Sequence, residues 1–115
     1  MKEEIKKLWL AALRSGKYNQ GQNALRRGNK FCCLGVLCDL HAKETSGKWR
    51  RMKVYLGGSV VLPTEVCVWA GLREPNPLAK TEDLSSSLVE LNDGGWSFSE
   101  IADIIEKEIP GDSDE

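Results

Sequence analysis

Side chains suited to holding an anion are concentrated between residues 14 and 30. The segment RSGKYNQGQNALRRGNKFCC, residues 14–33, carries five cations and no Asp or Glu. Guanidinium groups make forked hydrogen bonds to phosphate, amide side chains add further donors, and a tyrosine ring offers a stacking face. The segment therefore predicts a binding site for a phosphate or a nucleotide. Its candidate ligand-binding residues are Arg14, Lys17, Tyr18, Gln20, Gln22, Arg26, Arg27 and Lys30.

Two other interpretations of this basic segment stay open. Residues 1–58 hold 13 Lys or Arg and 4 Asp or Glu, a balance of +9, whereas residues 59–115 hold 3 and 13, a balance of −10. The basic surface could therefore pair with the acidic half of its own chain, or of another copy, without any ligand. Duplex nucleic acid is the less favoured partner, because the net charge is −1 and no recognition motif is present.

The cysteines and the single histidine offer a second kind of chemistry, which their spacing disfavours. Cys38 and His41 form one C-x-x-H pair, whereas a structural zinc site normally needs two such pairs. If Cys32, Cys33 and His41 share one helix, the histidine lies about 12–14 Å from either thiol, too far to act as its base. We therefore expect buried thiols here, with no catalytic residues, no metal site and no cofactor.

The elements that position the basic segment are predicted to be mainly helical. Apolar residues spaced along one helical face predict a helix over residues 2–15 that ends before Gly16. Residues 18–29 read as a loop with one helical turn around residues 23–27. The apolar run Phe31–Leu40 predicts a buried central helix, with Gly35 as a close-packing site. If this helix begins near residue 29 or 30, its N-terminal N–H groups join the arginines.

The second half of the chain predicts one hairpin and three further helices. Alternation over residues 52–56, followed by Gly57 and Gly58, predicts a β-hairpin whose second strand holds residues 60–62. Pro63 opens a short helix that ends at Gly71, and residues 73–80 form a surface loop. Leu84, Leu88 and Leu91 mark a fourth helix. Ser97 and Glu100 form a capping box that starts a fifth helix.

Together these elements predict a mainly α fold with a small β-hairpin (α+β). Four to five helices would pack around the buried central helix in a single globular domain over residues 1–109. Residues 110–115 form an acidic tail that we expect to be disordered. The chain holds no apolar run of the length that a transmembrane helix needs, and its N-terminus lacks the pattern of a signal peptide. We therefore expect a cytoplasmic protein with no membrane association.

Several motifs resemble those of a family of small proteins encoded in bacteriophage genomes. They are WLAALRSGKYNQG from residue 9, FCCLGVLCD from residue 31, LP…V…WAGL from residue 62 and LNDGGWSFSEIADIIE from residue 91. The resemblance implies a bacteriophage origin and no particular activity. By analogy, small accessory phage proteins often act against host defences. One such class forms oligomers that bind cyclic-nucleotide or cyclic ADP-ribose signals in pockets between subunits.

The leading functional hypothesis is an anti-defence homo-oligomer in the host cytoplasm. It would bind and sequester a small phosphorylated immune signal of the cyclic nucleotide or cyclic ADP-ribose type, without catalysis. One alternative is a protein that inhibits a host defence protein such as a nuclease. The other is an enzyme that cleaves a nucleotide.

Overall fold

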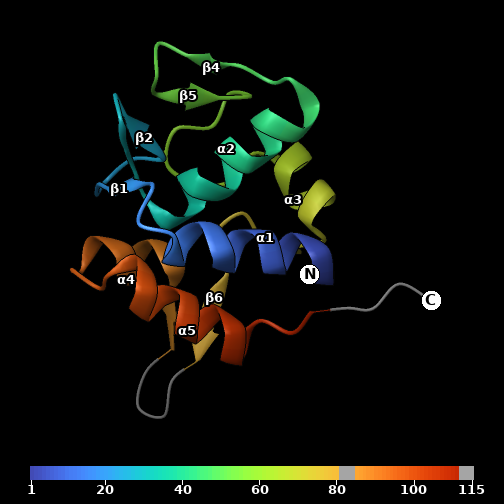
Figure 1. Cartoon of the computed structure of the whole chain (residues 1–115), viewed down its shortest axis with the longest axis vertical. Coiled ribbons are helices and arrows are strands. Elements are labelled where there is room, and N and C mark those ends of the chain that lie inside the picture. The colour runs from blue at the N-terminus through green and yellow to red at the C-terminus, as the bar shows by residue number, and fades with distance from the viewer. Residues whose placement is uncertain (81–84, 112–115) are drawn as a thin grey trace.

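The computed structural model describes residues 1–80 and 85–111, and within them the chain is mainly helical with small β-sheets (Figure 1). This α+β architecture confirms the predicted fold class. Residues 112–115 of the predicted acidic tail, and Leu84 of the predicted fourth helix, lie outside the described residues. The helices are α1 (Glu3–Arg14), α2 (Cys33–Thr45), α3 (Thr64–Ala70), α4 (Leu88–Asp93) and α5 (Phe98–Glu108). The strands are β1 (Asn19–Gln20), β2 (Arg26–Arg27), β3 (Lys30–Phe31), β4 (Trp49–Arg50), β5 (Val54–Tyr55), β6 (Leu78–Lys80) and β7 (Ser85–Ser87).

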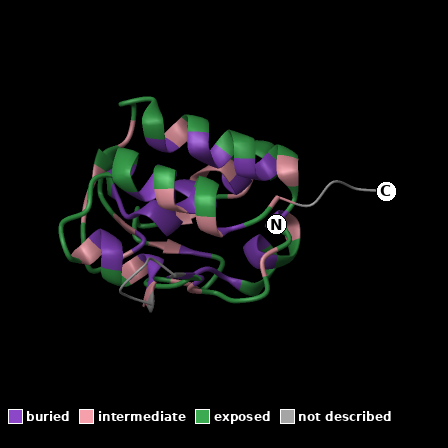
Figure 2. Ribbon diagram, turned by 90° about the horizontal axis from the view of Figure 1, so that it is seen from below, coloured by how far each residue is buried: buried purple, intermediate pink, exposed green. Residues whose placement is uncertain are grey.

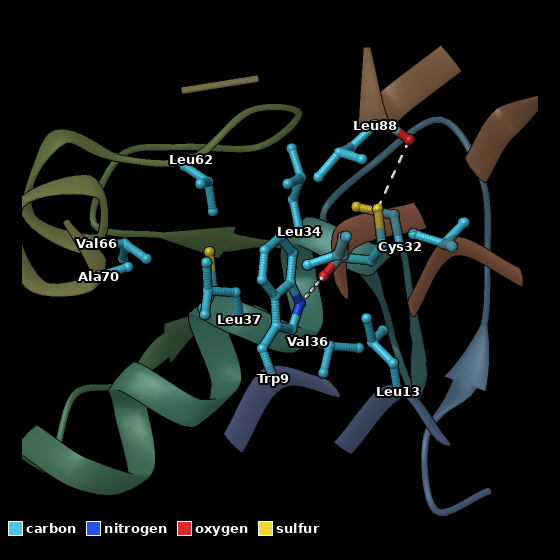
Figure 3. Packing of buried hydrophobic residues seen from close by; sticks show 14 of the residues in the cluster. Trp9, Leu13, Cys32, Leu34, Val36, Leu37, Leu62, Val66, Ala70 and Leu88 are labelled. Atoms are coloured by element: carbon cyan, nitrogen blue, oxygen red, sulfur yellow. Dashed lines mark hydrogen bonds between the residues drawn. The ribbon is translucent and has the colours of Figure 1, made fainter. Parts of the chain in front are cut away.

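Helix α2 is the centre of the core, as the apolar run predicted. All its residues from Cys33 to Cys38 are buried, and it packs against α1, α3 and α4. The Trp9 ring of α1 is fully buried, and its Nε1 donates to the Cys33 carbonyl oxygen at 2.9 Å (Figure 3). A Cβ atom on Gly35 would come within 1.8 Å of the Leu25 carbonyl oxygen. The prediction of close packing at Gly35 is therefore confirmed, and its partner is the loop that precedes β2.

The remaining helices present one face to this core and the other to solvent. Figure 2 shows buried residues on the inward sides of the helices and exposed residues on their outer sides. Helix α5 packs along α1, with Ile101 and Ile105 fully buried. Its predicted capping box is confirmed: the Ser97 hydroxyl accepts from Glu100 N–H, and the Glu100 carboxylate accepts from Ser97 N–H. Helix α1 differs from its predicted bounds by one residue at each end.

The basic segment contributes three short strands to a small sheet, whereas residues 21–25 form a loop, as predicted. Strand β3 lies between β1, to which it is parallel, and β2, to which it is antiparallel. Gly28, with φ of 62°, supplies the positive φ that the turn between β2 and β3 requires. The predicted helical turn around residues 23–27 is therefore wrong. Arg26 and Arg27 instead pair with Phe31 and Lys30 of β3.

A hairpin forms in this region, but not between the predicted strands at residues 52–56 and 60–62. Strands β4 and β5 pair antiparallel across a turn at Arg51 and Met52, which both have positive φ. The glycines predicted at the hairpin turn instead lie in a second tight turn, which closes a single bridge between Tyr55 and Gly58. Residues 60–62 form no strand, because Leu62 N–H donates to the Pro75 carbonyl oxygen.

The C-terminal third contains a hairpin that the sequence did not predict. Strand β6 pairs antiparallel with β7 where a surface loop and the start of a helix were expected. Helix α4 begins only at Leu88, because Ser87 and Glu90 form a capping box that fixes its start. Helix α3 matches its prediction and ends at Gly71, which has φ of 74°. Over the described ranges, none of the helices has the length and apolar character needed to cross a bilayer.

Candidate anion-binding site

Two adjoining cavities lie beside strands β2 and β3 and the loop at residues 21–24. The small cavity has a volume of about 210 Å³, and the large cavity has about 410 Å³. Among the residues that the structure describes, no carboxylate side chain lines either of them. The small cavity is lined by Gly21, Gln22, Asn23, Ala24, Arg27 and Lys30. The large cavity shares Asn23, Ala24 and Arg27 with it and adds Arg26, Lys53, Val54, Ser59 and Val60.

Two of the predicted cations face each other across the sheet at the small cavity. Arg27 of β2 and Lys30 of β3 are direct partners in the antiparallel register. Side chains of such partners project from the same face of a sheet, and like charges in this position destabilise the pairing. Both residues are exposed and both line the small cavity. A bound anion would neutralise this pair, which is the arrangement that a phosphate site requires.

The loop that forms the rim of both cavities is held by helix α4. Asn92 is fully buried, and its Nδ2 donates to the Gly21 carbonyl oxygen at 2.8 Å. The adjacent Asp93 accepts from Asn23 N–H at 2.9 Å. The loop therefore has a fixed backbone, which reduces the ordering cost of binding a ligand.

The sequence did not single out Asn92 or Asp93 as residues of the site. Asn92 Oδ1 also accepts from Gln20 Nε2 at 2.9 Å and from Cys33 N–H at 3.1 Å. Its partners in β1, the loop and α2 lie 59 to 72 residues away along the chain. Because these three partners are distant in sequence, no local pattern distinguishes Asn92 from an ordinary residue at a helix end.

The start of α2 does not join the arginines, which corrects the predicted site. The helix begins at Cys33 and not near residue 29 or 30, with Cys32 as its N-cap. Cys33 N–H donates to Asn92, and Gly35 N–H donates to the Cys32 sulfur at 3.4 Å. These N–H groups are buried and have partners within the protein. Cations and side-chain amides at the cavities therefore supply the positive potential without help from a helix N-terminus.

Arg14 and Lys17 lie outside both cavities. Arg14 forms 2.8 Å ion pairs with Asp103 and Glu106 of α5. The hydrogen bond to Glu106 raises the pKa of Arg14 most, and the hydrogen bond to Asp103 raises it further. This residue therefore joins the basic and acidic halves of the chain, as the interpretation without a ligand proposed. Lys17 is exposed just after α1.

Tyr18 and Gln20 are engaged within the protein. The Tyr18 hydroxyl donates to Asp39 Oδ2 at 2.6 Å and accepts from Lys43 at 3.2 Å. Burial is the main cause that raises the pKa of Tyr18, and the hydrogen bond to Asp39 raises it further. Gln20 Nε2 donates to Asn92 and to the Trp96 carbonyl oxygen. Of the eight predicted residues, the structure thus brings Gln22, Arg27 and Lys30 together at the small cavity, and Arg26 beside them at the large one.

The thiols and the histidine lie in the core and line neither cavity. Burial raises the pKa of Cys32 to about 11 and raises the pKa values of Cys33 and Cys38 as well. These thiols are protonated near neutral pH and so are poor nucleophiles. His41 Nδ1 lies 2.6 Å from the Tyr55 hydroxyl, and burial lowers the pKa of His41 although Glu65 opposes the shift. Across residues 1–80 and 85–111, no three His, Cys, Asp or Glu side chains gather as metal ligands would.

Fold and cavities together define a small α+β domain with a basic pocket beside a three-stranded sheet. The chain belongs to the family described as a domain of unknown function (DUF8296), which it matches over residues 1–109. No curated protein and no solved structure matches it.

Proposed function

We propose that this protein binds a small phosphorylated molecule of the nucleotide type and sequesters it without changing it. The observation that carries the proposal is the cross-strand pair of Arg27 and Lys30 on the wall of the small cavity. Gln22 and Asn23 add side-chain amides to the same wall. Two cations that repel each other, with no carboxylate in the lining, are stabilised by an anion.

The absence of catalysis in this proposal is supported by the state of the reactive side chains. A thiol enzyme needs a thiolate within reach of a base, whereas the pKa of the Cys32 thiol is raised to about 11. The Nδ1 atom of His41 is engaged by Tyr55 within the core. These features favour a binding protein over the alternative of a nucleotide-cleaving enzyme.

The resemblance to bacteriophage proteins supplies the biological setting of the proposal. The ligand would be a host immune signal of the cyclic nucleotide or cyclic ADP-ribose type, and its removal would block a defence response. A homo-oligomer in the host cytoplasm is part of this setting, where the four thiols would stay reduced. Sedimentation equilibrium with and without ligand would test the oligomeric state.

Calorimetric titration tests the proposed function directly. The ligands are AMP, cyclic dinucleotides, cyclic trinucleotides and cyclic ADP-ribose, and chromatography of the recovered ligand shows whether it has changed. We expect at least one of them to bind and to be recovered intact. Arg27→Gln and Lys30→Gln should each weaken that binding about tenfold or more, because each removes a hydrogen bond to a charged group.

Lys17→Gln is the matched control for these variants. It makes the same change of charge at an exposed residue outside both cavities. Its affinity should stay within about twofold of the unmodified protein, since only long-range charge is altered. Absence of heat with every ligand, in protein whose circular dichroism shows it to be folded, would overturn the proposal. Equal losses in the Lys17 and Arg27 variants would show that the cavity is not the site.

One observation favours protein binding as a second candidate function. Met52 lies at the tip of the β4–β5 turn and is 56% exposed, between Arg51 and Lys53. An exposed methionine among cations suits the inhibitor hypothesis, in which this turn contacts an acidic host protein such as a nuclease. A pull-down from host lysate would then retain a stoichiometric protein, and Met52→Asp would abolish its capture.

A further inference from the structure

The large cavity differs chemically from the small one that it adjoins. Both are lined by Arg27, so a single ligand that occupies the two would lie across this residue. The large cavity adds two valines, Val54 and Val60, beside Ser59 and the cations Arg26 and Lys53. Inorganic phosphate would gain no binding energy from contact with these aliphatic side chains. The two valines therefore suit the apolar part of a ligand whose phosphate lies in the small cavity.

Arg26 is the residue of the large cavity whose orientation is fixed most firmly. Its guanidinium carbon lies 4.7 Å from the centre of the Phe31 ring and 5.2 Å from that of Trp49. Its Nε donates to the Gly28 carbonyl oxygen at 2.6 Å. Two ring contacts and one hydrogen bond thus hold the guanidinium before any ligand arrives. A planar guanidinium can stack on a nucleobase.

Backbone hydrogen bonds hold the two walls of the large cavity together. Leu25 N–H donates to the Ser59 carbonyl oxygen at 2.8 Å, and Gly28 N–H donates to the Met52 carbonyl oxygen at 3.2 Å. They join the β2–β3 turn to the segment that carries Val54 and Val60. The cavity therefore keeps its width without a ligand, which favours recognition of a flat and rigid group.

We propose that the site has two compartments, with the phosphate of a nucleotide between Arg27 and Lys30 and its base in the large cavity against Arg26. This inference rests on the proposed function and deepens it in two respects. The ligand must carry a base, so that sugar phosphates and inorganic phosphates are poor ligands. Arg26 determines this specificity, whereas Arg27 and Lys30 determine affinity for the phosphate.

The test compares a nucleotide with phosphorylated ligands that lack a base. The tightest nucleotide from the calorimetric panel is titrated beside ribose 5-phosphate and inorganic pyrophosphate. Base stacking should make the nucleotide at least about tenfold tighter than ribose 5-phosphate. Arg26→Lys keeps the charge and removes the planar surface, and it should reduce this difference to about twofold or less. Arg27→Lys is its matched control. It should reduce the affinity for all three ligands and preserve the difference in affinity between the nucleotide and ribose 5-phosphate.

A second variant keeps the test independent of the packing around Arg26. Val60 is 45% exposed on the wall of the large cavity, so Val60→Trp fills that cavity without entering the core. This variant should reduce the affinity for the nucleotide at least about tenfold, because base stacking is lost. Its affinity for pyrophosphate should stay unchanged.

The possible outcomes separate this inference from the function on which it rests. Equal affinity for the nucleotide and ribose 5-phosphate would overturn the two-compartment site and leave phosphate binding standing. An equal loss for every ligand in Arg26→Lys would make Arg26 a phosphate contact and would also overturn it. Absence of binding by all ligands would overturn the proposed function together with the inference.

Discussion

The buried side chain of Asn92 fixes the position of Gly21, through a 2.8 Å hydrogen bond from Nδ2 to the Gly21 carbonyl oxygen. The same side chain accepts from Cys33 N–H, so one residue joins α4, the cavity loop and the start of the central helix. Its amide is fully buried and replaces water as the partner of these groups. The geometry of the candidate site therefore depends on a residue that does not line it.

Asn92→Ala should reduce both stability and binding. It removes the partner of the buried Cys33 N–H and of the carbonyl oxygen of the half-buried Gly21, which we expect to lower the free energy of unfolding by about 3 kcal/mol. Urea titration followed by circular dichroism measures this loss. The control is Asn19→Ala, which truncates an exposed asparagine in β1 and should change the free energy of unfolding by less than about 0.5 kcal/mol. Equal stability of the two variants would contradict the role assigned to Asn92.

The contact of Gly35 with Leu25 predicts that a methyl group cannot be accommodated there. In Gly35→Ala the new Cβ would lie 1.8 Å from a backbone oxygen, so the chain before β2 must move away. We expect a loss of about 3 kcal/mol or more, or failure to fold, as for other overpacked cores. Thermal denaturation measures the effect.

Gly28→Ala is the matched control for this substitution. Gly28 has φ of 62°, and a Cβ there would meet no heavy atom within 4 Å. Only backbone strain is added, which costs about 1 kcal/mol. A Gly35 variant no less stable than the Gly28 variant would show that α2 does not pack against the loop as described.

The sequence predicted those parts of the fold that depend on local patterns. Helices α1, α3 and α5 follow from apolar spacing, Gly71 and the Ser97 capping box. The buried central helix follows from a long apolar run, although its start was misplaced because a cysteine acts as its N-cap. The Gly28–Asn29 dipeptide is a recognised signal for a two-residue hairpin turn, and it could have revealed β2 and β3.

The site was predicted only in part, because its geometry depends on contacts between residues that are distant in sequence. Charge composition located Arg27 and Lys30, but only their strand register places them opposite each other. Composition also included Arg14, whose partners Asp103 and Glu106 are distant in sequence. Tyr18 was expected to stack on a ligand, whereas its hydroxyl bonds to Asp39 and its ring packs on Phe31 at 5.1 Å. Long-range pairing, which one sequence does not reveal, decides which polar residues are available.

Burial of the cysteines predicts a loss of stability in alkaline solution. The pKa of Cys32 is raised from 9.0 to about 11 in the folded protein. Above pH 9 the unfolded chain therefore binds fewer protons than the folded protein, so the free energy of unfolding falls as pH rises towards 11. For this thiol the loss at pH 10 is about 1 kcal/mol. Urea titrations at pH 8 and pH 10 measure it.

Cys32→Ser separates this thiol from other groups that titrate in the same range. Serine is a favoured N-cap and can accept from Gly35 N–H as the sulfur does. The variant should fold and should lose about 1 kcal/mol less than the unmodified protein between pH 8 and pH 10. If both proteins lose the same amount, the Cys32 thiol is not held protonated by burial.

The most direct test of the central claim is a map of backbone amide chemical shifts in ¹⁵N-labelled protein during titration with pyrophosphate and then with the nucleotide panel. The proposal predicts that the amides of Gly21–Ala24, Arg27 and Lys30 shift in a saturable manner, while Lys17 and α5 do not. The same titration of Arg27→Gln should leave these amides nearly unchanged. Absence of saturable shifts with every ligand, or shifts confined to α1 and α5, would contradict an anion site at the Arg27–Lys30 pair.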